Sequence, residues 1–81
     1  MGKTVVVNYF ALFREQSGLS RENCATDCST LAELYEELSR KHGFSLRLKE
    51  LRVAKNDEFC AWESSFNSGD EIVFIPPVAG G

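Results

Sequence analysis

Residues 72–81 read Ile72-Val73-Phe74-Ile75-Pro76-Pro77-Val78-Ala79-Gly80-Gly81, an apolar run followed by two prolines and a diglycine. The apolar run contains only β-branched and aromatic residues, which predicts a buried strand over 72–75. Proline lacks a backbone N–H and restricts the residue before it to extended conformations, so the prolines end this strand and direct the chain away from the sheet. We therefore predict a domain over residues 1–75 and an extended tail over residues 76–81.

The predicted tail carries almost no side-chain bulk at its end. From Pro76 it spans about 18–20 Å when extended, at roughly 3.1–3.5 Å per residue. Ala79, Gly80 and Gly81 are small enough to enter a narrow channel, where groups of another protein could reach a carboxylate on Gly81. A terminal diglycine alone also fits a frayed chain end. The series of strand, prolines and diglycine favours the threading interpretation.

Length and charge limit the possible functions. A chain of 81 residues forms one domain and needs most of its large apolar residues for the core, which leaves few for an active site. The net charge of −3, with both signs scattered along the chain, is not typical of a nucleic-acid-binding surface. The sequence has no apolar run of about 20 residues for a membrane span and no signal-peptide pattern at its start. We expect a cytosolic protein that binds neither nucleic acid nor a membrane.

The cysteines and the histidine do not suggest a metal or catalytic centre. Cys24, Cys28 and Cys60 are an odd number in a chain without a secretory signal, which favours reduced, packed thiols. The spacing from Cys24 to Cys28 is longer than the usual metal or redox spacing, and no further pair of ligands completes a zinc set. His42 has no acid or nucleophile spaced around it and is interpreted as a helix-end residue. We expect no metal site.

The first half of the chain predicts a strand pair and one well-defined helix. Residues 4–10 alternate between two faces, and residues 20–26 predict a second strand paired with them beyond a short helix over 11–18. Thr30 and Glu33 form a capping-box pattern that begins a longer helix, which Gly43 ends. The apolar stripe of this helix consists of Leu31, Leu34, Tyr35 and Leu38.

The second half predicts a hairpin and the final strand. Residues 51–55 and 58–61 form two strands around a tight turn. Phe66 is expected to anchor the turn-rich segment 62–68, and Gly69 to form the turn before the final strand. The first and last strands are the most apolar, so we expect them to be central, adjacent and parallel. These elements predict an α+β fold, in which one main helix covers one face of a mixed sheet.

Four motifs identify a resemblance. They are Tyr9-Phe10-Ala11-x-x-Arg14-Glu15-x-x-Gly18, the Thr30-capped leucine helix, Gly69-Asp70-Glu71, and Ile75-Pro76-Pro77-Val78-Ala79-Gly80-Gly81. Together they resemble the ubiquitin-like β-grasp sulfur carriers, and most closely the MoaD-like small subunits of molybdopterin synthase. Thiamine-pathway carriers share the Gly-Asp turn and the diglycine, but not usually the two prolines or the segment 10–18.

The resemblance implies that the chemistry takes place on Gly81. An activating enzyme would use ATP to adenylate the Gly81 carboxylate, and sulfur would then replace AMP to give a thiocarboxylate. The large subunit of molybdopterin synthase would receive the tail, residues 76–80, and transfer the sulfur to a pterin precursor to build the dithiolene. That subunit would hold the catalytic pterin site, in a heterotetramer of two small and two large subunits. This chain would donate sulfur and bind no cofactor of its own.

The resemblance also implies an apolar contact surface for the large subunit. If the strand alternation holds, Phe10, Phe59 and Ile75 lie together on the sheet face opposite the helix, with Arg14 at its edge. Such a surface needs a partner, because a free monomer leaves it in water. Three unrelated surface side chains would give the same pattern, and this alternative stays open.

Other functions fit the same ending. A sulfur carrier of the thiamine type would pass sulfur to another acceptor, and a ubiquitin-like modifier would use an activated Gly81 to form isopeptide bonds with lysines. A β-grasp interaction module would carry an inert tail. Mass spectrometry after incubation with an activating enzyme, ATP and a sulfur donor distinguishes a thiocarboxylate, a conjugate and an unchanged terminus.

Overall fold

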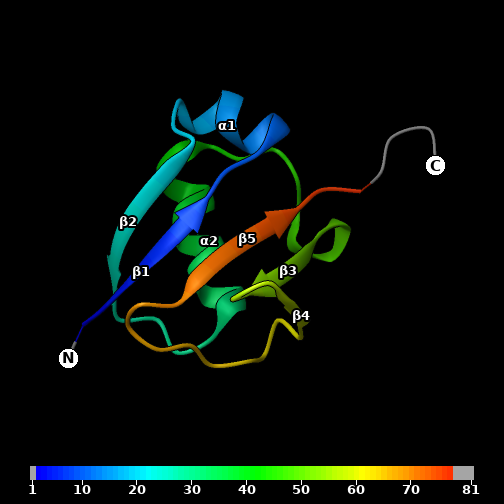
Figure 1. The fold of residues 1–81 in the computed structure, drawn as a ribbon. Coiled ribbons are helices and arrows are strands. Elements are labelled where there is room, and N and C mark those ends of the chain that lie inside the picture. The colour runs from blue at the N-terminus through cyan, green and yellow to red at the C-terminus, as the bar shows by residue number, and fades with distance from the viewer. Residues whose placement is uncertain (1, 78–81) are drawn as a thin grey trace.

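A mixed sheet with one long helix behind it makes up the protein in the computed structural model, which describes residues 2–77 (Figure 1). The sheet order is β2-β1-β5-β3-β4, in which β1 and β5 are parallel and the other neighbours are antiparallel. The elements are β1 (Lys3–Asn8), α1 (Ala11–Ser17), β2 (Arg21–Thr26), α2 (Leu31–His42), the 3-10 helix η1 (Leu48–Glu50), β3 (Arg52–Lys55), β4 (Glu58–Cys60) and β5 (Glu71–Ile75). The predicted α+β architecture, with the first and last strands central and parallel, is confirmed.

The helix α2 begins and ends as its sequence predicts. The Thr30 hydroxyl accepts a hydrogen bond from the backbone N–H of Glu33 at 3.2 Å, and the Glu33 carboxylate accepts one from the N–H of Thr30 at 3.2 Å. Gly43 ends the helix with φ at +73°, a conformation that glycine adopts without strain. The apolar stripe is buried against the sheet and consists of Leu31, Leu34, Tyr35 and Leu38.

Alternation along the strands sends one set of side chains into the core. Val7 of β1 lies opposite Ile72 of β5, and Val53 of β3 lies opposite Phe74 of β5. All four are at most 1% exposed, and the Phe74 ring lies 4.9 Å from the ring of Tyr35 on α2. Full burial of each such side chain contributes about 1.5–3 kcal/mol, so this layer between sheet and helix supplies much of the stability.

The structure corrects the end of the first strand. We predicted a strand over residues 4–10, but β1 ends at Asn8 and Phe10 is the N-cap residue of α1. Tyr9 still donates its backbone N–H to Ser20 at 2.9 Å, so the chain remains extended up to the turn at Ala11. The 3-10 helix η1 was not predicted either. It is stabilised locally, because the Glu50 carboxylate accepts a hydrogen bond from the backbone N–H of Arg47 at 2.8 Å.

Two turns set the register of the last three strands. Asn56 and Asp57 have φ values of +53° and +71° and close the β3–β4 hairpin, as expected for residues that tolerate the left-handed region. Gly69, with φ at +91°, donates its N–H to the carbonyl of Thr4 at 2.8 Å and so aligns β5 with β1. Phe66 is 1% exposed and anchors the preceding segment, as predicted.

Candidate functional site

The strand β5 carries the chain to the start of the tail. Ile72 and Phe74 face α2, so Val73 and Ile75 face the opposite side of the sheet, which we call the outer face. After Ile75 the chain continues through Pro76 and Pro77 beyond the edge of the fold (Figure 1). The remaining predicted site residues, Val78, Ala79, Gly80 and Gly81, lie outside the described residues.

A groove lies where the tail starts. Its walls are formed by Phe59 of β4, by Ile75, Pro76 and Pro77, and by residues 49–52. Arg52 lies opposite Ile75 across β3 and β5, and its guanidinium carbon is 5.4 Å from the centroid of the Phe59 ring. This cation–π contact holds the Arg52 and Phe59 side chains together beside the tail. The β3–β4 register places Phe59 opposite Ala54, and therefore on the same face as Ile75.

Phe10 lies at the other side of the outer face. Asn8 is opposite Val73 in the parallel pair of β1 and β5. Phe10 follows Asn8 by two residues and Ile75 follows Val73 by two residues, so Phe10 is level with Ile75. The sheet order separates β1 from β4 by three strand spacings, about 14 Å at roughly 4.8 Å each. Phe10 and Phe59 therefore flank Ile75 and do not form one tight cluster. Arg14 is exposed on α1, one turn after Phe10.

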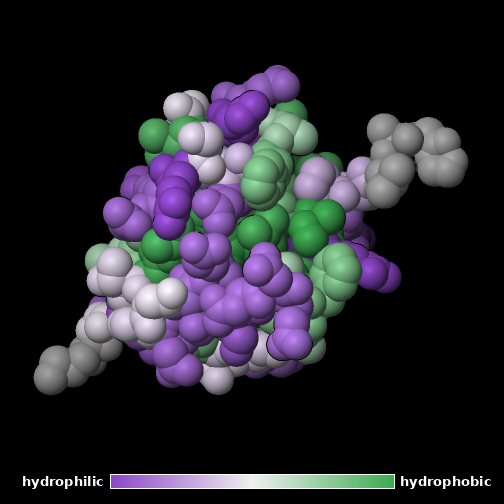
Figure 2. Space-filling view, viewed as in Figure 1, coloured by the Kyte–Doolittle hydropathy of each residue, from purple (hydrophilic) through white to green (hydrophobic). Residues whose placement is uncertain are grey.

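The outer face between these residues is mainly apolar. Phe10 is 55% exposed and Phe59 is 63% exposed, which is unusual for large aromatic side chains. Figure 2 shows hydrophobic side chains gathered over β5 and toward the start of the tail, with hydrophilic side chains around them. We define the apolar patch as Val6, Phe10, Ala54, Phe59, Val73 and Ile75. Exposed apolar side chains gathered on one face in this way are typical of a contact site for another protein.

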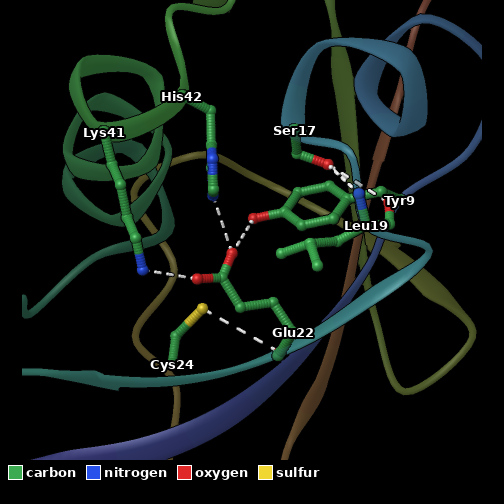
Figure 3. A network of polar contacts seen from close by, with 7 residues as sticks. All are labelled: Tyr9, Ser17, Leu19, Glu22, Cys24, Lys41 and His42. Carbon is green, nitrogen blue, oxygen red and sulfur yellow. Dashed lines mark hydrogen bonds and ion pairs between the residues drawn. The ribbon is translucent and has the colours of Figure 1, made fainter.

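A polar cluster lies on the helix side of β2, around the carboxylate of Glu22 (Figure 3). One oxygen, Oε1, accepts a hydrogen bond from the Tyr9 hydroxyl at 2.7 Å and lies 2.8 Å from His42 Nε2, while Oε2 accepts one from Lys41 Nζ at 2.5 Å. We call these four residues the Glu22 network. Burial alone would raise the pKa of Glu22, but the hydrogen bonds from Lys41, Tyr9 and His42 outweigh it and lower the pKa to about 2.

The Glu22 network is structural, because its groups already satisfy one another. Burial and the nearby carboxylate raise the pKa of Tyr9 well above its ordinary value, so the hydroxyl remains a donor. The network ties the end of β1 to β2 and to the last turn of α2. Cys24 and Thr26 point inward from β2, and Glu22, which the sequence analysis did not single out, has the same strand parity. A charged residue at an inward position requires a partner, and that requirement was the signal available in the sequence.

The cysteines are free thiols in protected positions, as predicted. Cys24 is buried, and its burial raises the pKa of the thiol to about 11. Burial and a hydrogen bond to Glu37, at 3.0 Å, raise the pKa of the Cys28 thiol. Cys60 is half-buried and packs against the core. The thiols of Cys24 and Cys28 are therefore protonated at neutral pH and poor nucleophiles.

The open hollow beside α2 is lined by several carboxylates, two of which already accept hydrogen bonds within the fold. Glu33 caps the helix, and Glu37 accepts hydrogen bonds from Thr26 at 2.6 Å and from Cys28. Among residues 2–77, no group of three His, Cys, Asp or Glu side chains is arranged to hold a metal ion. In the same part of the chain no helix has the length and apolar character to cross a membrane.

Comparison with known proteins identifies the family of this chain. The model of the ThiS family matches residues 7–81, which is nearly the whole chain. The chain belongs to the ThiS family. A relative in Haemophilus influenzae named molybdopterin synthase sulfur carrier subunit is 36% identical to this ThiS-family chain over 78 residues, 93% of this chain and 96% of the relative.

Several solved structures resemble this ThiS-family chain. A protein–protein complex of subunits 1 and 2 of molybdopterin-converting factor from Helicobacter pylori matches with a TM-score of 0.64 and 30% identity, over 96% of this chain and 99% of the matched chain. SAMP1 from Haloferax volcanii matches with a TM-score of 0.78 over 96% of this chain and 99% of its own, but at 24% identity it is evidence for the fold alone. The predicted ubiquitin-like β-grasp fold is confirmed.

Proposed function

We propose that this chain is the sulfur carrier subunit of a molybdopterin synthase, and that Gly81 carries the sulfur. A carboxylate is a poor electrophile, so an activating enzyme first lets a Gly81 oxygen attack the α-phosphate of ATP, and pyrophosphate leaves. A sulfur nucleophile then attacks the acyl carbon and displaces AMP, which gives a thiocarboxylate. The activating enzyme binds the ATP, and this chain holds no cofactor of its own.

The observation that carries the proposal is the position of the tail relative to the apolar patch. Pro76 and Pro77 leave the sheet beside Ile75 and Phe59, at the groove that also contains Arg52. One partner can therefore cover the patch and receive the chain that continues from Pro77. Family membership and the named relative in Haemophilus influenzae support the same reading.

The chemistry of the described residues also supports a carrier. The thiols of Cys24 and Cys28 are protonated, and the Glu22 carboxylate is held by three hydrogen-bonding partners. Among the described residues, none of these groups lines the groove at the start of the tail. Sulfur transfer to the pterin precursor is therefore assigned to the large subunit, with Gly81 as the donor.

The proposed partner is the large subunit, in a heterotetramer of two small and two large subunits in the cytosol. Phe10, Phe59 and Ile75 provide the apolar contacts, and Arg14 adds a charged contact at the edge. A complex between two subunits in the related Helicobacter pylori structure supports a partner of this kind. Tail residues 76–80 enter a narrow channel, which keeps water away from the reactive acyl group.

Mass spectrometry of the intact chain tests the proposal. After incubation with the activating enzyme of the same organism, ATP and a sulfur donor, the mass should increase by the exchange of one oxygen for sulfur at Gly81. Addition of the large subunit and the pterin precursor should reverse this increase as product forms. Conjugation to lysines would instead identify a protein modifier, and sulfur transfer only to a thiazole precursor would identify a thiamine-type carrier.

A further inference from the structure

Ala11 has a backbone conformation that alanine rarely adopts. Its φ is +50°, and the other described non-glycine residues with positive φ are Asn56 and Asp57. Asn and Asp tolerate the left-handed region through local hydrogen bonds of their side chains, whereas the Cβ of alanine crowds the backbone there. Ala11 is therefore a strained position, and strain of this kind persists only where the surrounding structure imposes it.

The residues on both sides of Ala11 are firmly held. Tyr9 is 1% exposed, donates its N–H to Ser20, and donates its hydroxyl to Glu22 (Figure 3). Phe13 is fully buried, with its ring 5.0 Å from the ring of Phe44. The N–H of Phe13 donates to the carbonyl of Phe10 at 3.1 Å and closes the turn around Ala11.

Phe10 is the exposed residue within this anchored corner. Its backbone is extended, with φ −126° and ψ 156°, and its ring lies mainly in solvent. Glycine would form the same turn without strain, but it would also let the backbone at Phe10 and Ala11 visit more conformations. Alanine limits these backbone conformations, so the chain loses less conformational entropy than with glycine when a partner covers Phe10.

We propose that the left-handed backbone of Ala11, held between Tyr9 and Phe13, positions the exposed Phe10 ring for binding to the large subunit. This inference rests on the proposed function, because it assigns Phe10 to that interface. Ala11 is a positioning residue here, since it acts through the direction and the restricted freedom of its neighbour. The Glu22 network contributes by fixing Tyr9 at the start of the turn.

Two substitutions separate backbone freedom from backbone strain. Ala11→Gly removes the strain and frees the chain, whereas Ala11→Asn lowers the strain and keeps a residue that favours the left-handed conformation locally. Both variants should melt at the same temperature as the parent or higher. In the free protein, backbone NMR relaxation should show increased motion at Phe10 in Ala11→Gly but not in Ala11→Asn. Calorimetry with the large subunit of the same organism should give binding about fivefold weaker for Ala11→Gly only.

The outcomes distinguish this inference from the proposed function. Parent-like motion at Phe10, or parent-like affinity, in Ala11→Gly overturns the positioning role. An equal loss of affinity in both variants also overturns it, because the effect would then follow the Ala11 side chain and not its backbone. A parent chain that does not bind the large subunit overturns the proposed partner itself, while the NMR measurement still decides whether Ala11 restrains Phe10.

Discussion

The Tyr9 hydroxyl donates a hydrogen bond to the Glu22 carboxylate at 2.7 Å, and the residue that follows Tyr9 is the exposed Phe10. This hydrogen bond and the ion pair between Glu22 and the exposed Lys41 side chain thus fix the strand end from which the proposed interface residue projects. Lys41 and His42 bring the last turn of α2 into the same cluster. The apolar patch is therefore supported from behind by polar contacts.

Glu22→Gln should destabilise the fold by about 1–3 kcal/mol at neutral pH, because the buried Tyr9 hydroxyl loses a charged acceptor at a side chain that is only 10% exposed. The pKa of Glu22 in the folded protein, about 2, lies below its ordinary value of 4.5, so its stabilising effect is complete above that ordinary value and is lost as the pH falls from there toward 2. Urea unfolding at neutral and acidic pH measures the loss of stability in Glu22→Gln. Glu15→Gln, at an exposed position of α1, is the control. An equal loss at every pH would contradict the linkage.

Phe59→Asp and Ile75→Asp should weaken binding to the large subunit by at least about tenfold, because a partner would desolvate the new charge. The melting temperature should change much less for Phe59→Asp, since Phe59 is 63% exposed in the free domain. Asn23→Asp is a matched control, because Asn23 lies opposite Val6 on the outer face, but on the edge strand β2. Calorimetry that finds the affinities of Phe59→Asp and Ile75→Asp equal to that of the parent would remove the patch from the interface.

The triple variant Cys24→Ala, Cys28→Ala, Cys60→Ala should still accept sulfur, because the proposed acceptor is the acyl carbon of Gly81. Loss of the buried Cys24 thiol should cost about 1–2 kcal/mol of stability, since it leaves a small cavity. Circular dichroism confirms folding, and mass spectrometry measures thiocarboxylate formation. A folded triple variant that gains no sulfur would show that a thiol takes part.

Local patterns predicted the elements, and tertiary pairing determined what they missed. The Thr30–Glu33 capping box and the leucine stripe define α2 within one stretch of sequence, and the apolar character of β1 and β5 indicates their central position. The partners of Glu22 lie 13 to 20 residues away from it, so no local pattern reveals the network.

The candidate site was predictable to a similar extent. Alternation in β4 and β5 places Phe59 and Ile75 on one face, whereas the contact of Arg52 with Phe59 depends on the strand register. Alanine favours helix, and nothing in the sequence indicates the left-handed turn at Ala11 that ends the extended chain after β1.

Gly80→Val should leave folding unchanged, because β5 ends at Ile75 and residue 80 lies beyond it in the sequence. Adenylation or sulfur transfer should fall sharply, since a Cβ would clash in a channel that fits closely around the backbone. An unfolding curve and a pyrophosphate-release assay on the same sample measure both properties. A variant that fails to fold would show that the tail is packed structure.

Deletion of Gly81 tests the central claim most directly. The new carboxylate would stop about 3.5 Å short of the reacting atoms, so its approach to ATP and later to the pterin precursor would be lost. The measurement is mass spectrometry of the intact chain together with a dithiolene-product assay, for the parent and the deletion variant under the same conditions. We predict a thiocarboxylate and product with the parent, and neither with the deletion variant at an unchanged melting temperature. Full sulfur loading and product formation by the deletion variant would contradict the assignment of the chemistry to Gly81.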